Sequence, residues 1–243
     1  MCGAKGPEDT VPGHATHQLT GTRTHQCDAT ATRATRDGGR AYVLLDGIGS
    51  NPAVRDWTRD QARRLADLTA RSLQPHLAIT RLREEIALEP GWQNTVPGAC
   101  AVAAVTGPNR ILRIAWIGDC RAYLLYPDGY LGRHTTDHNM RTVLEARDGQ
   151  APRWARNRIT HCLGHPDAGE ALIPDWTTDP DRTGTRLLLA SDGCYEPIED
   201  AGHTVATALA DGTPADAAKR LVRLAIKLGD GNKDNATCLV ADL

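Results

Sequence analysis

Short apolar runs that lead directly into an acidic turn recur along this chain, and they constrain its fold more than any other feature. The run RLLLASDGCY, at residues 186–195, places four apolar residues immediately before Ser191-Asp192-Gly193. The runs AYVLLDGIG at residues 41–49 and ILRIAWIGDCR at residues 111–121 follow the same pattern. A short apolar run bounded by a turn signal predicts a buried strand. Each acidic residue should therefore lie where a strand emerges at the edge of a sheet.

A further acidic residue stands just before the predicted closing strand 236–241, in GNKDN at residues 231–235. A lone buried carboxylate is costly unless a cation or a hydrogen-bond network meets it. Several carboxylates at strand ends become reasonable if they share one site. We therefore expect a single acidic site formed by Asp46, Asp119, Asp192 and Asp234.

The length and composition favour one domain. The chain has 243 residues, 40% of them apolar, and no linker divides it. The 28 Lys and Arg residues against 30 Asp and Glu residues give a formal charge of -2. Because there is no overall basic field, we expect neither nucleic acid nor a membrane as a partner. We also expect a monomer.

The cysteines and the N-terminal residues bear on the compartment. The 7 cysteines are scattered and never spaced C-x-x-C, which indicates neither a disulfide framework nor a zinc site. The N-terminus lacks an apolar signal core, and no apolar run is long enough to span a membrane. These features predict a reduced, cytoplasmic protein.

The order of the predicted elements indicates the fold class. Residues 1–18 are rich in Gly, Pro, Thr and His without periodicity, which predicts a disordered lead and a domain over residues 19–243. That domain should begin with a strand from Leu19 to about Arg23, and residues 151–181 read as a mobile flap. Helices are expected near residues 54–68, 76–88, 140–148, 204–210 and 213–228. The first two and the last two form pairs, with strands between the pairs and no regular strand–helix alternation, which predicts an α+β fold with sheets sandwiched by helices.

The last of these helices has the clearest boundaries. Thr213 is the predicted N-cap, Pro214 the first helical residue, and Asp216 is in capping-box register. Gly229 follows the predicted end.

The acidic residues suit hard divalent cations. Mg²⁺ and Mn²⁺ take carboxylate and carbonyl oxygens, so a site of three or four aspartates with little His or Cys fits them. Two such ions held close together can lower the pKa of a bridging water and polarise a phosphoryl oxygen, which phosphate-ester hydrolysis requires. The competing interpretation is that each Asp-Gly is only a turn, since this is the commonest turn dipeptide.

The joint order of the motifs distinguishes these interpretations. It resembles that of the metal-dependent Ser/Thr protein phosphatases, the PPM or type-2C family, from about residue 19 to residue 243. The motifs that carry the resemblance are Arg23 with Asp28, Asp46-Gly47, Gly118-Asp119-Cys120-Arg121, Asp137-His138, Ile159-Thr160 with Leu163-Gly164, Ser191-Asp192-Gly193 and Asp234-Asn235.

The resemblance implies a four-layer α-β-β-α sandwich, in which two antiparallel sheets are flanked by helix pairs. It implies that Asp46 bridges two Mn²⁺ or Mg²⁺ ions, that the carbonyl of Gly47 binds one, and that Asp192 and Asp234 complete the pair. Asp119 matches a position that helps to hold a third, weaker ion. Arg23 matches the arginine that binds the substrate phosphate, for which a planar guanidinium is well suited.

The implied reaction is hydrolysis of phosphoserine and phosphothreonine by a water that the two metals activate, without a phosphoenzyme. The partners implied are a phosphorylated protein substrate and, with it, a Ser/Thr kinase or the targets of that kinase.

The chain departs from the family pattern beside the expected metals. Cys27 replaces the usual glutamate that orders a metal-bound water, whereas the neighbouring Asp28 is retained. Ile48 stands where some members carry a histidine. Cys27, Cys120 and Cys194 all lie beside motif residues, which suggests either redox sensing or simple packing of small buried side chains.

Two other functions compete with an active phosphatase. The lost glutamate at Cys27 is compatible with a pseudophosphatase, which would keep the fold as a binding or regulatory module. Against it stands the presence of three carboxylates that repel one another without a metal, those of Asp46, Asp192 and Asp234. Gly47-Ile48-Gly49 after a strand suggests dinucleotide binding, but the third glycine of that fingerprint is missing.

Overall fold

The computed structural model describes residues 13–90, 96–107, 111–164, 175–179, 184–231 and 233–243. Two five-stranded sheets form its centre, and every paired strand within them is antiparallel. The first sheet has the order β1 (His14–Leu19), β10 (Ala236–Asp242), β9 (Arg186–Ala190), β6 (Arg121–Leu125) and β7 (Leu131–Arg133). The second has the order β2 (Ala29–Ala34), β3 (Arg40–Gly47), β4 (Ala99–Thr106), β5 (Leu112–Ile117) and β8 (Asp175–Asp179).

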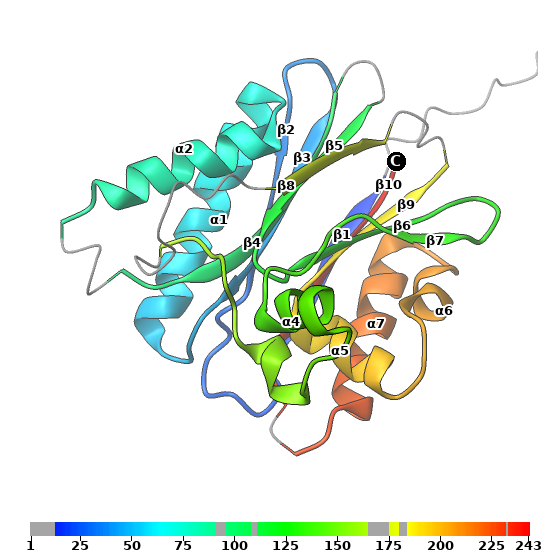
Figure 1. Cartoon of the computed structure of the whole chain (residues 1–243). Coiled ribbons are helices and arrows are strands. Elements are labelled where there is room, and N and C mark those ends of the chain that lie inside the picture. Colours follow the sequence, from blue (N-terminus) through cyan, green and yellow to red (C-terminus); the bar gives the residue numbers. More distant parts are fainter. Residues whose placement is uncertain (1–12, 91–95, 108–110, 165–174, 180–183, 232) are drawn as a thin grey trace, which may run out of the picture.

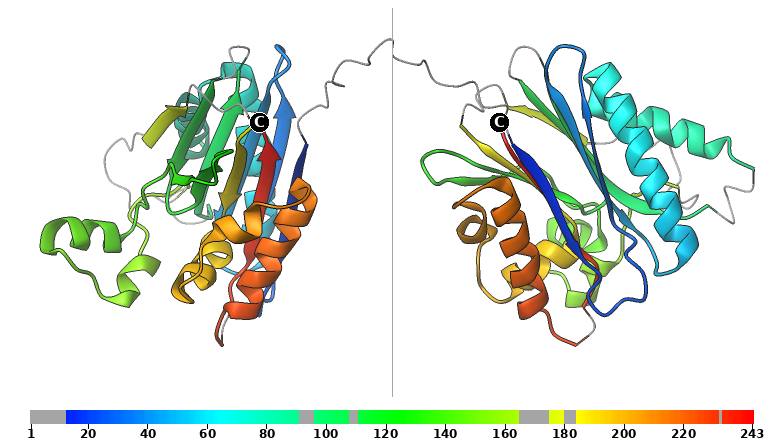
Figure 2. Two further views of the ribbon diagram at one scale, coloured as in Figure 1. Left: turned by 90° about the vertical axis from the view of Figure 1, so that its right-hand side faces the viewer. Right: turned by 180° about the vertical axis from the view of Figure 1, so that it is seen from behind.

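Helices cover the outer face of each sheet, as Figures 1 and 2 show. The second sheet is covered by α1 (Pro52–Ser72) and α2 (Pro75–Ala87), and the first by α5 (Asp192–Asp200), α6 (Val205–Leu209) and α7 (Pro214–Leu228). Two shorter helices, α4 (Met140–Asp148) and η1 (Arg153–Asn157), lie in the segment between β7 and β8. This arrangement confirms the predicted α+β, four-layer sandwich.

The alternation of side chains along β3 explains why its sequence is a continuous apolar run. Tyr42 and Leu44 join the cluster between the two sheets. Val43 and Leu45 point the other way and pack under α1 and α2. Successive side chains of a strand face opposite sides, so a strand covered on both faces is apolar throughout.

Local signals fixed the helix ends. Asn51 caps α1 by accepting a hydrogen bond from the backbone of Val54 at 3.0 Å. The predicted capping box of α7 is present, with Thr213 and Asp216 bonded to each other's backbone. Gly229 follows its last residue. None of the described helices is long and apolar enough to cross a membrane.

The N-terminal boundary was placed too late. β1 begins at His14 and pairs along its whole length with β10, so residues 14–18 belong to the sheet and not to a disordered lead. The predicted strand from Leu19 to Arg23 was correspondingly wrong, because the chain leaves β1 after Leu19. β1 is an edge strand of mainly exposed residues, so its ladder to β10, far away in sequence, decides its conformation. Residues 1–12 of the expected lead lie outside the described residues.

The expected flap, residues 151–181, is only partly described. Its first part contains η1, but residues 175–179 form β8, which pairs with β5 at the edge of the second sheet. For residues 175–179 the predicted flap was therefore wrong, because they form a strand of the sandwich.

Candidate active site

A cavity of about 690 Å³ opens at one end of the two sheets. It brings together all the acidic residues expected at strand ends. Those that line it are Asp46, Asp119, Asp192 and Asp234, together with Arg23 and Gly47. The structure therefore places in one cavity residues that span more than 200 positions of sequence.

Each aspartate reaches the cavity from a different chain segment. Asp46 is the penultimate residue of β3, and Asp119 lies in the turn between β5 and β6. Asp192 is the first residue of α5, directly after β9. Asp234 precedes β10. The antiparallel pairings align these strand ends on one side of the molecule.

Glycines allow the backbone to approach closely at two of these positions. A Cβ at Gly47 would lie 2.5 Å from the Thr58 hydroxyl and 2.6 Å from the Cys27 carbonyl oxygen. Gly118 has φ +98°, and a Cβ there would meet Cys100 at 2.4 Å. Both positions therefore require glycine.

The acidic side chains of the cavity destabilise one another's ionised forms. Burial, and then the charges of the other aspartates, raise the pKa of Asp46. Burial followed by the charge of Asp234 raises the pKa of Asp192, and burial followed by the charge of Asp192 raises that of Asp119. Opposing hydrogen bonds are too few to offset these effects. A cation among these carboxylates would relieve the repulsion.

Asp28 lies behind this group and is only 2% exposed. It accepts a hydrogen bond from the Ser191 hydroxyl at 2.9 Å. Burial raises its pKa to about 8, although hydrogen bonds from Thr237 and Ser191 act in the opposite direction. It does not line the cavity, but it acts on the site in two ways: its charge raises the pKa of Asp46, and it bonds Ser191, the residue that precedes Asp192.

Arg23 forms an ion pair with Asp234, with Nη2 2.5 Å from Oδ2. Both side chains are partly exposed, at 44% and 41%. The guanidinium thus stands at the mouth of the acidic cavity, where an anionic substrate group would meet it.

Cys27 is buried, with 1% of its surface exposed. Its backbone N–H donates to the side-chain oxygen of Asn235 at 2.7 Å, and its thiol donates to the carbonyl of Asn51 at 3.7 Å. Cys27 therefore links Asn51, the residue before α1, to Asn235 through its thiol and its backbone. It does not line the cavity.

The three cysteines beside the motifs are poorly suited to redox sensing. Burial raises the pKa of Cys27 and of Cys120. Contact with Cys238, together with burial, raises the pKa of Cys194. Reactive thiols are typically partly exposed and have a lowered pKa, so the packing interpretation is favoured.

Sequence reasoning missed a charged wall of the cavity, formed by η1 and α5. Arg156 pairs with Glu196 at 3.2 Å and with Asp200 at 2.8 Å, and Arg153 reaches Asp200 at 3.4 Å. Burial, and then the charge of Asp192, raise the pKa of Glu196 to about 7. Glu196 follows Asp192 by one helical turn, so a helix prediction from Asp192 would have found it. No sequence signal pointed to the arginines.

The donor set fits hard divalent cations, because the cavity is lined by aspartate carboxylates and by Gly47. Within the described part of the chain, no three His, Cys, Asp or Glu side chains already converge as a metal cage. The observation in favour of a cation is the mutual repulsion of Asp46, Asp119 and Asp192, for which the described residues show no ion pair with an arginine or lysine.

Several phosphatases are similar to this chain, although no family model matches it. The serine/threonine protein phosphatase PstP of Mycobacterium tuberculosis is 30% identical over 221 residues, which cover 85% of this chain and 41% of PstP. The probable protein phosphatase 2C 33 of Oryza sativa subsp. japonica is 28% identical over 155 residues, 54% of this chain and 35% of the relative. This chain thus spans 41% of the length of PstP and 35% of the length of the plant relative.

Solved structures agree over nearly the whole chain. The PPM Ser-Thr phosphatase MsPP of Mycobacterium smegmatis, in complex with cacodylate, has a TM-score of 0.76 and 25% identity, and the match covers 95% of this chain and 98% of MsPP. The catalytic domain of PstP in complex with 2 manganese ions has a TM-score of 0.73 and 26% identity, with 95% and 97% covered.

Fold, cavity and relatives define one class of protein, the PPM-type phosphatases with two antiparallel sheets between helix layers. The chain belongs to this PPM family of Ser/Thr phosphatases.

Proposed function

We propose that this protein is a metal-dependent phosphatase that hydrolyses phosphoserine and phosphothreonine in protein substrates. The observation that carries the proposal is the convergence of Asp46, Asp119, Asp192 and Asp234 with Arg23 in one cavity. The manganese ions in the PstP structure support Mn²⁺ as the metal, and the oxygen donors suit Mg²⁺ equally.

Each acidic residue has a role in this proposal. Asp46, the carbonyl of Gly47, Asp192 and Asp234 would hold two divalent cations, and Asp119 with Asp192 would hold a third more weakly. Bound there, such cations lower the pKa of a water molecule and offset the negative charge of a phosphate.

Arg23 is the residue of the chain that would bind the substrate phosphate. Its planar guanidinium can donate two parallel hydrogen bonds to phosphate oxygens. Since it now donates to Asp234, phosphate binding would exchange one anionic partner for another. This exchange keeps the guanidinium paired throughout.

The proposed reaction assigns no role to histidine. Among the described residues that line the cavity none is a histidine, and Ile48 occupies the position beside Gly47. Protonation of the leaving group would therefore fall to water in the cavity. Asp28 would support the site from outside the cavity, by accepting the Ser191 hydrogen bond and so fixing the start of α5.

The substrate and the alternative follow from the same site. Because the reaction consumes phosphoserine or phosphothreonine, a Ser/Thr kinase must supply its substrate. A pseudophosphatase gains no support, since the cavity keeps its aspartates and the similar proteins are phosphatases. Loss of the glutamate at Cys27 changes a position that lies outside the cavity lining.

The proposal is tested by initial rates on p-nitrophenyl phosphate and on a phosphothreonine peptide, with Mn²⁺ added or chelated. Wild type should turn over both substrates only with the metal. Asp46→Asn should lower the rate by about 100-fold or more, because it removes a charge on which the metals depend. The matched control, Asp37→Asn, alters an exposed aspartate in the turn between β2 and β3 and should leave the rate unchanged. Equal rates in wild type and Asp46→Asn, or turnover that chelation leaves intact, would overturn the proposal.

A further inference from the structure

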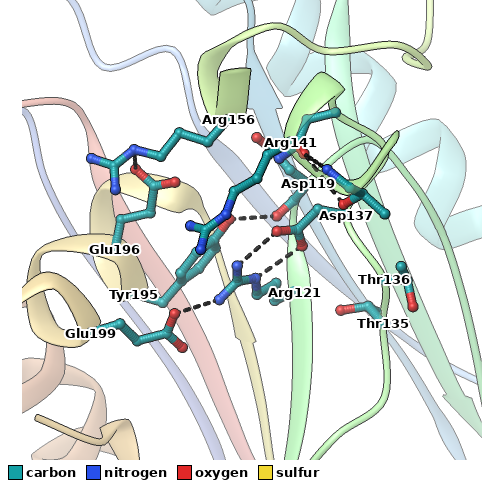
Figure 3. Close-up of polar contacts among 12 residues, drawn as sticks. Asp119, Arg121, Thr135, Thr136, Asp137, Arg141, Arg156, Tyr195, Glu196 and Glu199 are labelled. Atoms are coloured by element: carbon teal, nitrogen blue, oxygen red, sulfur yellow. Dashed lines mark hydrogen bonds and ion pairs between the residues drawn. The ribbon is translucent and has the colours of Figure 1, made fainter. Parts of the chain in front are cut away.

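A buried arginine beside the acidic cavity joins two of the elements that carry its aspartates. Arg121, the first residue of β6, is 6% exposed. Its guanidinium donates two hydrogen bonds to Asp137, at 2.9 and 2.7 Å, and a third to Glu199 at 2.7 Å. Its Cζ also lies 3.7 Å from the centre of the Tyr195 ring. Figure 3 shows the guanidinium enclosed by these three side chains.

The charges of this cluster balance one another. Asp137 is 7% exposed and receives a second guanidinium, that of Arg133. Two guanidinium groups thus face the carboxylates of Asp137 and Glu199. Buried charges persist only when they are paired and hydrogen-bonded, so this network holds Arg121 in one position.

The network ties α5 to the start of β6. Tyr195 and Glu199 lie one and two turns after Asp192 on α5. The Tyr195 hydroxyl donates a hydrogen bond to the backbone carbonyl of Asp119 at 3.0 Å. Arg121 therefore fixes Tyr195 through its ring and Tyr195 fixes the backbone of Asp119 through its hydroxyl. Arg121 and Tyr195 together form a clamp that holds the segments of Asp119 and Asp192.

The clamp opposes a repulsion. Asp119 and Asp192 both line the cavity, so their like charges repel each other when both carboxylates are ionised. The terminal pair of the β6–β9 ladder, Arg121 with Ala190, joins the two strands, but Asp119 and Asp192 lie two residues beyond it. A side-chain connection between α5 and the turn that carries Asp119 therefore limits how far the two aspartates can separate. Arg121 provides that connection without lining the cavity.

We propose that Arg121 is a positioning residue that sets the separation of Asp119 and Asp192, and with it the affinity of the cavity for its most weakly bound divalent cation. This inference rests on the proposed function. Asp46 and Asp234 approach the cavity from β3 and from the segment before β10, outside the clamp, so the more tightly bound cations should be less affected.

Metal titration without substrate tests the inference. Metal-free protein is titrated with Mn²⁺ in a calorimeter for wild type, Arg121→Lys and Tyr195→Phe. Lysine keeps the charge but cannot form the two-pronged bond to Asp137, and phenylalanine removes only the hydroxyl that donates to Asp119. The weakest Mn²⁺ affinity should fall about tenfold in Arg121→Lys and a few-fold in Tyr195→Phe, while the tightest should stay within about threefold.

The matched control is Arg186→Lys. Arg186 also pairs with a carboxylate, that of Asp242 at 2.6 Å, and it lies at the far end of the same strand pair, opposite Leu125 of β6. It should leave every Mn²⁺ affinity unchanged even if it lowers stability. Amide hydrogen exchange of metal-free protein gives a second readout, since the first turn of α5 should exchange faster in Arg121→Lys than in Arg186→Lys.

The outcomes separate the two proposals. Wild type that binds no Mn²⁺ would overturn the proposed function and this inference with it. Wild type that binds Mn²⁺, with the weakest affinity unchanged in Arg121→Lys and Tyr195→Phe, would overturn only the inference. Should Arg121→Lys fail to fold, the Tyr195→Phe titration decides by itself.

Discussion

At the scale of single residues, the site depends on backbone that leaves no room for side chains. Gly47 is enclosed by the Thr58 hydroxyl, the Cys27 carbonyl and Val54, all within 2.8 Å of a built Cβ. α1 and the Cys27 segment thus approach β3 closely at the residue that follows Asp46 in the cavity lining. The glycine therefore serves the fold and the cavity together.

Gly47→Ala should lower the free energy of unfolding by about 2 to 3 kcal/mol, because an overpacked core must shift to admit the methyl group. Urea unfolding of metal-free protein measures the loss. Gly107→Ala is the matched control, since its nearest contact is the end of the Arg113 side chain at 3.4 Å, and it should change stability by less than about 1 kcal/mol. Equal stability of Gly47→Ala and wild type would contradict the close packing described around Gly47.

Sequence reasoning at this scale found the residues that end strands and missed those that face them. Asp46, Asp119, Asp192 and Asp234 follow apolar runs or precede one, and this placed them at sheet ends. Arg153 and Arg156 sit in a turn-rich segment without periodicity, and their ion pairs to α5 depend on a tertiary contact. Such contacts leave no trace in the local sequence.

At the scale of elements, local signals predicted helices well and edge strands poorly. The helix α7 carries its N-cap, its first-turn proline and its capping-box acid within four residues, so its start could be predicted from the sequence. β1 carries none of the signals of a strand, because its whole ladder is supplied by β10, more than 200 residues later. β8 was assigned to a flap for the same reason, since only its pairing with β5 makes it a strand.

The central strands were the exception among strands. β3, β4 and β9 are buried on both faces, and burial leaves an apolar run that is visible without knowledge of the partner strand. These are also the strands that end near the cavity or deliver its residues. The functional part of the fold was therefore more predictable than its periphery.

At the scale of the whole molecule, the acidic cavity couples stability to pH. Asp28 has a pKa of about 8 in the folded protein and about 3.9 when unfolded. Between these values the folded state holds a proton that the unfolded state has lost. The free energy of unfolding is therefore greatest at a pH below the unfolded-state pKa, and this stability is lost as the pH rises through the folded-state pKa. The raised pKa values of Asp46, Asp119 and Asp192 act in the same direction.

Metal-free protein should lose on the order of 2 kcal/mol of unfolding free energy between pH 6 and pH 8 from Asp28 alone. Saturating Mn²⁺ should reverse this trend, because it binds the ionised carboxylates, so the increase in Tm on adding Mn²⁺ should be larger at pH 8 than at pH 6. Thermal unfolding at the two pH values, with and without the metal, measures both effects. Metal-free protein that is more stable at pH 8 would contradict the assigned electrostatics.

The central claim is that the aspartates of the four strand ends form one divalent-cation site. Anomalous diffraction from a crystal soaked in Mn²⁺ tests it most directly. We predict at least two manganese peaks in the cavity, one of them in contact with both Asp46 and Asp192. A well-diffracting, Mn²⁺-saturated crystal with no anomalous peak at these carboxylates would contradict it.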